Sequence, residues 1–343
     1  MSPEPFVHLH VASGYSLQYG ASHPHALVEA AAEQEMDALA LTDRGGTYGA
    51  VKFVKACRSA GIDPILGVDL AVLATEVTGP TSRHGTTKTP VKGGAFREQA
   101  LPRATFLAHA GGAGGRAGWA GICRLVSATH LTGERGQPIA ELPGVAPWLA
   151  GGDVVVLLGP DSEFGRAVGQ GSDDRALRLL RPWLEVVPPE NLIVELVSHQ
   201  VAGQGRGSTP HAARMMRLAR RAGLASVLTN AVRYAERRDA PVVDVLDAAR
   251  RLVALDRRHV DRRNAEGFLK AGKQMHEIAE EICRLSGIGE TDREARLLLA
   301  RTRALADRCR LDPRTDLGIG EVHFPEFDAL GGQAHARPGL GGG

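Results

Sequence analysis

Short apolar segments and segments with helical spacing alternate along the first seventy residues. Apolar runs at 6–10, 38–41 and 64–72 predict β-strands, and the stretches 23–34 and 48–60 repeat apolar positions every three to four residues, which predicts helices. Strands joined by helices imply parallel strands with right-handed crossovers. The pattern therefore predicts an α/β fold.

Two residues predict where these helices begin and end. Ser22 is expected to be the N-cap of the first helix, because its hydroxyl can accept a hydrogen bond from an amide of the first turn. Gly61 follows the second helix and can adopt the left-handed conformation common at a helix C-terminus.

The alternation continues to residue 236. Further predicted elements are strands at 105–109, 153–158, 192–197 and 226–230, and helices at 119–129 and 210–221. Six or seven strands, each leading into a helix, favour a closed barrel over an open sheet. Residues 74–101 are rich in Thr, Gly, Pro and Lys without a period, which predicts a mobile insertion or long loop.

After residue 236 the strand pattern stops. Helical spacing at 242–252, 274–285 and 293–309, with no strand between, predicts the start of a helical domain over 237–328. Residues 329–343 are rich in glycine and have no period, so we expect a disordered tail.

Composition narrows the class of protein. The formal net charge of +2 is close to balance and implies no polyanionic partner by itself, and 4% aromatic residues predict a core of Ala, Val and Leu. The four cysteines lack C-x-x-C spacing, which favours a reducing compartment. Neither a signal peptide nor an apolar run of membrane-spanning length is evident, so we expect a cytoplasmic protein without a membrane partner.

The best candidate chemistry is His8-Leu9-His10, at the end of the first predicted strand. Side chains at i and i+2 of a strand project from one face, and imidazole is a good ligand for zinc and related metals. Strand ends are also where α/β barrels carry their active sites. Histidine serves many other roles, however, so the pair alone does not establish a metal site.

Other polar positions favour structural interpretations. Asp43, at a strand end beside Gly45-Gly46, is expected to accept hydrogen bonds from turn amides or to pair with Arg44. Glu195 and His199 are interpreted as surface or loop residues. The glycine-rich stretch 111–118 has no lysine and does not match a phosphate-binding loop.

Two groups of arginines raise the question of nucleic-acid binding. The group at 214, 217, 220 and 221 is interpreted as a solvated helix face. The group at 257, 258, 262 and 263 could contact a DNA backbone.

Several short motifs follow one another in a specific order along the chain. They are Phe6-Val7-His8-Leu9-His10, Tyr15-Ser16, Gly20-Ala21-Ser22, Ala38-Leu39-Ala40-Leu41-Thr42-Asp43, Tyr48-Gly49, Gly61 to Asp69, Leu125-Val126-Ser127, Leu192 to Leu196, Thr229 to Tyr234 and Asp244 to Leu252. In this order they resemble one known family, the polymerase-and-histidinol-phosphatase (PHP) domain at the N-terminus of DnaE-type DNA polymerase III alpha subunits. The resemblance covers residues 5–328 and is closest to the actinobacterial error-prone type.

The resemblance implies a distorted (β/α)7 barrel over 5–236, with a metal cluster at the C-terminal ends of its strands. His8 and His10 match the first ligand pair of the family, and Asp69 stands in for a glutamate. The remaining ligand positions depart from the pattern. Tyr19 stands where an aspartate is common, Arg44 replaces a histidine, Pro160 falls near a cysteine or histidine, and Ala231 and Arg233 replace an Asp-x-His pair.

These departures predict a degenerate metal site. A guanidinium stays protonated and has no lone pair to donate, so Arg44 and Arg233 would place positive charge where cations bind and could pair with Asp43 or Asp69 instead. At most one residual ion, zinc or manganese, is left for His8, His10 and Asp69. No catalytic residue and no small-molecule cofactor is assigned to this chain.

By resemblance, the chain is the N-terminal PHP region of a DNA polymerase III alpha subunit, with a structural role. DNA synthesis, with Mg²⁺ as cofactor, would take place in a palm domain beyond this chain. DNA and other replication or repair proteins would be partners of the full-length protein. The alternative is a stand-alone PHP-type metal-dependent phosphoesterase, which the replaced ligands disfavour.

Overall fold

The computed structural model describes residues 5–73, 89–90, 96–97, 101–111, 114–132, 138–256, 258, 260 and 262–320. The expected tail at 329–343 lies outside the described residues. So does the expected insertion at 74–101, apart from Leu101 and two short strands, β3 (Thr89–Pro90) and β4 (Phe96–Arg97), which pair with each other.

The main sheet is curled and has the strand order β1-β2-β5-β7-β8-β9, with β6 also pairing with β2. Its strands are β1 (Ala38–Leu41), β2 (Asp63–Leu73), β5 (Arg103–Ala108), β6 (Ile139–Glu141), β7 (Val154–Leu158), β8 (Leu192–Val197) and β9 (Ser226–Thr229). All the strands predicted between residues 38 and 230 are present, and sequence reasoning missed β6.

The expectation of an all-parallel sheet is wrong at β5. This strand runs antiparallel to both of its neighbours, β2 and β7, whereas the other pairs are parallel. The chain leaves β2 and enters β5 at the same edge of the sheet, which gives antiparallel neighbours. The intervening stretch carried no strand or helix pattern from which this reversal could be predicted.

The N-terminal segment closes the sheet, although it is not the regular strand predicted at 6–10. The carbonyls of His8 and Val11 accept from the amides of Ala40 and Thr42 of the β1 segment, at 3.0 and 2.8 Å. On the other side, His10 and Ala12 exchange backbone hydrogen bonds with Val232 after β9, both 2.9 Å. The segment bends at Leu9. The segment thus occupies the seventh strand position of a distorted (β/α)7 barrel. This arrangement confirms the predicted fold class.

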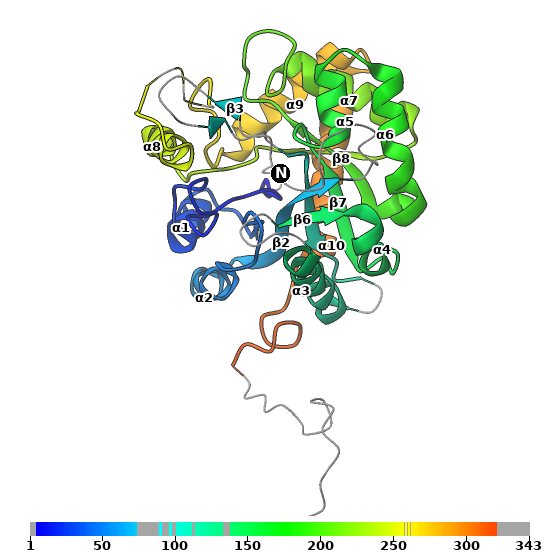
Figure 1. The fold of residues 1–343 in the computed structure, drawn as a ribbon. Coiled ribbons are helices and arrows are strands. Elements are labelled where there is room, and N and C mark those ends of the chain that lie inside the picture. The colour runs from blue at the N-terminus through cyan, green and yellow to red at the C-terminus, as the bar shows by residue number, and fades with distance from the viewer. Residues whose placement is uncertain are drawn as a thin grey trace, which may run out of the picture.

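Helices cover the outside of the sheet (Figure 1). They are α1 (Pro24–Glu33), α2 (Ala50–Ala60), α3 (Gly115–Thr132), α4 (Leu142–Leu149), α5 (Glu163–Gly169), α6 (Asp173–Val186), α7 (Thr209–Arg221), α8 (Ala240–Arg250), α9 (Gly272–Ser286) and α10 (Thr291–Cys309), with 3₁₀ turns η1 (Pro189–Asn191) and η2 (Arg237–Asp239). Helices α4, α5 and α6 were not predicted. None of the helices in the described ranges is long and apolar enough to cross a membrane.

The two predicted helix caps had different outcomes. Gly61 ends α2 with φ 69°, as expected. Ser22 is not the N-cap of α1, because His23 occupies that position and makes no side-chain cap. The Ser22 hydroxyl instead accepts from the amide of Ala235 at 2.8 Å. It therefore ties the start of α1 to the segment after β9.

Helices after residue 237 share the core of the barrel. Leu305, Ala306 and Cys309 of α10 pack in one buried cluster with Val7 and Leu9 of the N-terminal segment. Helix α9 supplies Met275, Ile278 and Ile282 to the larger outer cluster. Helices α9 and α10 therefore bury their apolar side chains against the barrel. The predicted domain boundary at 236/237 stays a prediction.

Candidate functional site

We use the term barrel mouth for the charged residues at one end of the sheet, where the parallel strands terminate and β5 begins. Arg44 follows β1, Asp69 lies in β2 beside it, Arg103 opens β5, and Arg233 follows β9. The residues sit there because parallel strands expose their carboxyl ends at a common edge. This is the edge at which the family resemblance places its metal cluster.

Asp69 forms ion pairs with two arginines of the barrel mouth. Its carboxylate is buried and accepts from Arg44 Nε at 3.1 Å and from Arg103 Nε at 2.9 and 3.0 Å. Arg103 Nη2 also donates to the backbone carbonyl of Asp69 at 2.7 Å. The hypothesis that Arg44 pairs with an aspartate is therefore confirmed, with Asp69 as the partner and Arg103 as an additional cation that was not predicted.

Tyr19 lies between two guanidinium groups. The Cζ atom of Arg44 is 3.2 Å from the centroid of the Tyr19 ring, and that of Arg233 is 4.0 Å from it. A cation over an aromatic face is attracted by the ring quadrupole. Three positions that depart from the family pattern therefore contact one another as a single stacked unit.

The partner predicted for Arg233 is wrong. Arg233 Nη2 donates to Asp247 Oδ1 at 2.9 Å and to the carbonyl of Tyr19 at 3.0 Å, rather than to Asp43 or Asp69. Asp247 is buried in α8. The position of α8 beside the barrel, which sequence spacing does not reveal, decides this pairing.

Asp43 has the structural role that was expected. The buried carboxylate accepts from the Ser13 amide at 2.7 Å, from the Ser13 hydroxyl at 3.0 Å and from the Ser16 hydroxyl at 2.8 Å. Burial raises the pKa of Asp43 although these hydrogen bonds oppose the shift. A Cβ on Gly49 would lie 2.7 Å from Asp43 Oδ2, so this position requires glycine.

His10 forms a buried ion pair at the floor of the mouth. Its Nδ1 lies 2.8 Å from Glu195 Oε1, and the same oxygen accepts from Thr229 Oγ1 at 2.5 Å. Burial lowers the pKa of His10, but the charges of Glu195 and Asp69 and the Glu195 hydrogen bond outweigh burial, so the pKa is raised overall. The interpretation of Glu195 as a surface residue is wrong, because β8 is buried throughout.

His8 lies in a different environment. Its Nε2 donates to the carbonyl of Lys270 at 2.9 Å, its ring packs edge-on against Phe6, and its Nδ1 has no hydrogen-bond partner. Burial lowers the pKa of His8 to about 4. His8 and His10 share no polar partner, because the bend at Leu9 breaks the alternation expected of a strand.

His199 lies half-buried in the loop after β8, in agreement with its interpretation as a surface or loop residue. Its Nε2 donates to the carbonyl of Asn230 at 2.8 Å. Burial lowers the pKa of His199 to about 4. The fixed partner is a backbone carbonyl more than thirty residues away in sequence, which no local pattern could indicate.

The other two replaced ligand positions hold no donor side chain. Pro160 follows β7, and Ala231 follows β9 with φ 42°, a left-handed conformation unusual for alanine. At the mouth, both oxygens of Asp69 accept from guanidinium groups, and Arg44 and Arg233 bring positive charge. This set does not fit a multinuclear metal cluster. Binding of one ion by His8, His10 and Asp69 stays a prediction.

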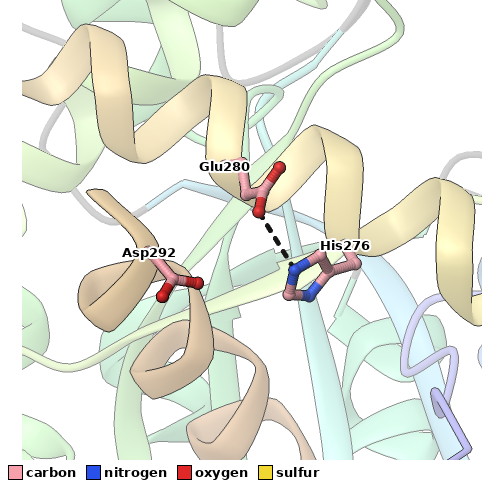
Figure 2. Close-up of side chains that lie close together, drawn as sticks. All are labelled: His276, Glu280 and Asp292. Atoms are coloured by element: carbon pink, nitrogen blue, oxygen red, sulfur yellow. Dashed lines mark hydrogen bonds and ion pairs between the residues drawn. The ribbon is translucent and has the colours of Figure 1, made fainter. Parts of the chain in front are cut away.

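Within the described ranges, one group of His, Cys, Asp or Glu side chains has three ligand atoms within 4.8 Å of one another. It consists of His276, Glu280 and Asp292 (Figure 2). Sequence reasoning missed it because Asp292 lies on a different helix from the other two. The i, i+4 spacing of His276 and Glu280 was the available signal.

Several arginines of the two groups form ion pairs. Arg214 pairs with Asp173 at 2.7 Å, Arg258 with Asp256 at 3.0 Å, and Arg262 with Asp244. Arg257 lies outside the described residues. Contact of the second group with a DNA backbone stays a prediction.

Comparison with known proteins agrees with this architecture. The PHP domain family matches residues 8–199, which is more than half of the chain. The chain belongs to the PHP-domain family. The matched residues include His8, His10, Arg44, Asp69 and Glu195, whereas Ala231 and Arg233 lie beyond them.

Curated relatives of this PHP chain are DNA polymerases. An error-prone DNA polymerase of Mycolicibacterium paratuberculosis is 28% identical over 96% of this chain and 27% of its own length, and one of Mycobacterium bovis is 30% identical over 82% and 23%. A DNA polymerase III subunit alpha of Pseudomonas aeruginosa is 27% identical over 95% and 24%. The chain spans about a quarter of the length of these relatives.

Two solved structures resemble the fold more distantly. An amidohydrolase from Chromobacterium violaceum superposes with a TM-score of 0.40 at 15% identity, covering 65% of this chain and 86% of its own. A putative metal-dependent phosphoesterase from Bifidobacterium adolescentis gives a TM-score of 0.38 at 13% identity, covering 66% and 86%.

Proposed function

We propose that this chain is the PHP region of an error-prone-type DNA polymerase III alpha subunit, and that its barrel mouth stabilises the domain instead of hydrolysing phosphoesters. The observation that carries the proposal is the contact of Arg44 and Arg233 with Tyr19, together with the pairing of Arg44 and Arg103 with Asp69. Positions that bind cations in the family pattern here supply cations of their own.

The chemistry of the mouth supports this proposal. Metal-assisted hydrolysis needs lone-pair donors that hold an ion with an open position for water. Here Asp69 is engaged by two guanidinium groups, and Glu195 by His10 and Thr229. Both oxygens of Asp69 and Oε1 of Glu195 therefore accept fixed hydrogen bonds, which favours a structural role over the phosphoesterase alternative.

The proposed role extends to the whole polymerase of which this chain would be the PHP region. That protein would copy DNA in replication or translesion repair, with Mg²⁺ held in a palm domain, and would bind DNA and other replication or repair proteins. It would act in the cytoplasm. The similarity to error-prone polymerases over 82% and 96% of the chain supports this assignment.

The test combines a phosphatase assay with metal analysis of the purified chain. We expect no hydrolysis of a chromogenic phosphomonoester with added zinc or manganese, in the wild type or in His10→Ala. Turnover abolished by His10→Ala, with stoichiometric metal lost from that variant, would establish the phosphoesterase alternative. Binding of one zinc or manganese ion without turnover, lost in His8→Ala, His10→Ala and Asp69→Asn, would support the residual site and keep the non-catalytic role.

A variant that restores metal-ligand side chains tests the same proposal through a gain of metal binding. Combining Arg44→His, Ala231→Asp and Arg233→His returns donor side chains to three replaced positions. If the arginines are what excludes metal from the mouth, this variant should bind more zinc or manganese per chain than the wild type. Unchanged metal content in a folded variant would show that the arginines do not decide occupancy.

A further inference from the structure

Helices α9 and α10 bring three side chains with metal-binding atoms together outside the barrel mouth (Figure 2). His276 and Glu280 lie one turn apart on α9, with His276 Nε2 3.2 Å from Glu280 Oε1. Asp292 lies in the first turn of α10. All three ligand atoms lie within 4.8 Å of one another.

The local fold explains this arrangement. Side chains at i and i+4 of a helix lie on the same face, which places His276 beside Glu280. The turn between the helices contains Gly287 and Gly289, with φ 64° and 60°, a left-handed conformation that glycine adopts without strain. This turn lets α10 double back against α9, so that Asp292 approaches the pair on α9.

The three side chains form a chemically mixed ligand set. One imidazole and two carboxylates are ligands that zinc and neighbouring divalent transition metals accept, with a fourth position left for water. Ligand atoms around tetrahedral zinc lie about 3.4 Å apart, given bonds of about 2.1 Å. The observed separations of 3.2 to at most 4.8 Å require only small rotations of half-exposed side chains.

We propose that His276, Glu280 and Asp292 bind one divalent transition-metal ion of the zinc type, which fastens the start of α10 to α9. The ion would also support the barrel, because α10 contributes Leu305, Ala306 and Cys309 to the interior cluster. This site does not depend on the proposed function of the barrel mouth.

One neighbouring cation bears on the site. Arg296 Nη2 donates to Asp292 Oδ2 at 2.7 Å. The other carboxylate oxygen, Oδ1, remains available to an ion, while Arg296 holds the carboxylate in orientation, as outer-shell partners of metal ligands do. With three partly exposed ligands, the site should bind zinc more weakly than a closed four-ligand structural site.

The experiment is calorimetric titration of the full chain with ZnCl2 and NiCl2, followed by thermal unfolding with and without zinc. We expect one ion per chain, and a rise in Tm of roughly 3–6 °C at a zinc concentration about a hundredfold above Kd. His276→Gln and Asp292→Asn should weaken binding at least about tenfold. Glu277→Gln, at an exposed neighbouring position on the same helix, is the matched control and should bind like the wild type.

Three results would overturn the proposal. The first is zinc binding that is absent, or equal in the wild type, His276→Gln and Asp292→Asn. The second is equal binding of Mg²⁺ or Ca²⁺, which would indicate a simple carboxylate site because these ions prefer oxygen ligands. The third is loss of the ion in His10→Ala but not in His276→Gln, which would place the metal at the barrel mouth and leave the question of turnover there to the phosphatase assay.

Discussion

His8 and His10 are two residues apart, and their surroundings shift the pKa of the imidazole in opposite directions. Around His8, burial favours the neutral ring and lowers its pKa to about 4, although the hydrogen bond to the Lys270 carbonyl opposes this shift. Around His10, Glu195 and Asp69 favour the charged ring and raise its pKa. The difference shows that a His-x-His motif can persist in sequence while its two members serve separate structural purposes.

The largest effect expected at the barrel mouth is that of Asp69→Asn. This change removes the carboxylate shared by Arg44 and Arg103 and leaves two largely buried cations without their counter-charge. We expect a loss of about 3 kcal/mol in the free energy of unfolding, measured by urea denaturation. The matched control is Asp173→Asn. The ion pair of Asp173 with Arg214 is more exposed, so its removal should lower the free energy of unfolding by under about 1 kcal/mol. Equal losses in the two variants would mean that the ion pairs of Asp69 stabilise the fold no more than a surface ion pair does.

The next effect is the loss of stability in acid that His8 causes. The unfolded chain protonates His8 near pH 6.5 and the folded chain only near pH 4, so stability is lost as pH falls through this window. The slope due to His8 is about 1.4 kcal/mol per pH unit, or roughly 3 kcal/mol across the window. His8→Gln should reduce the acid slope of the unfolding free energy, whereas His25→Gln, at an exposed position, should not. An unchanged slope in His8→Gln would contradict a buried neutral His8.

A smaller effect is expected from Tyr19→Leu. Loss of the ring between Arg44 and Arg233 removes two cation–π contacts and should lower the free energy of unfolding by about 1–2 kcal/mol in denaturant titrations. Tyr19→Phe keeps the aromatic face and should retain most of this energy. If the two variants were equally destabilised, the aromatic face would not be what stabilises the stacked unit.

The smallest effect expected is that of Glu195→Gln on His10. Because the folded-state pKa of His10 is raised, its contribution to stability is fully present below pH 6.5 and is lost as pH rises through the folded pKa. Glu195→Gln removes the charge that outweighs burial, so the pKa of His10, followed by NMR titration, should fall. The pKa of His8 should stay near 4. A parallel shift in the pKa values of both histidines would mean that their environments are coupled and not independent.

Much of the fold was predictable from local pattern. Apolar runs and helical spacing located β1, β2, β5, β7, β8 and β9 and most helices to within a few residues, because burial imposes those periods directly on the sequence. The motifs identified the PHP family, and the replacement of ligands by Arg44 and Arg233 predicted a mouth with positive charge in place of donors. The choice of Asp69 as partner of Arg44 was among the pairings predicted.

The remaining features depend on contacts between segments far apart in the chain. The reversal of β5, the bend at Leu9, the pairing of Arg233 with Asp247 and the burial of Glu195 each depend on where another element packs. The same holds for Asp292 beside His276. Local sequence determines which residues favour a strand, a helix or an ion pair, but the folded chain decides which partner lies within the few ångströms over which hydrogen bonds and ion pairs act.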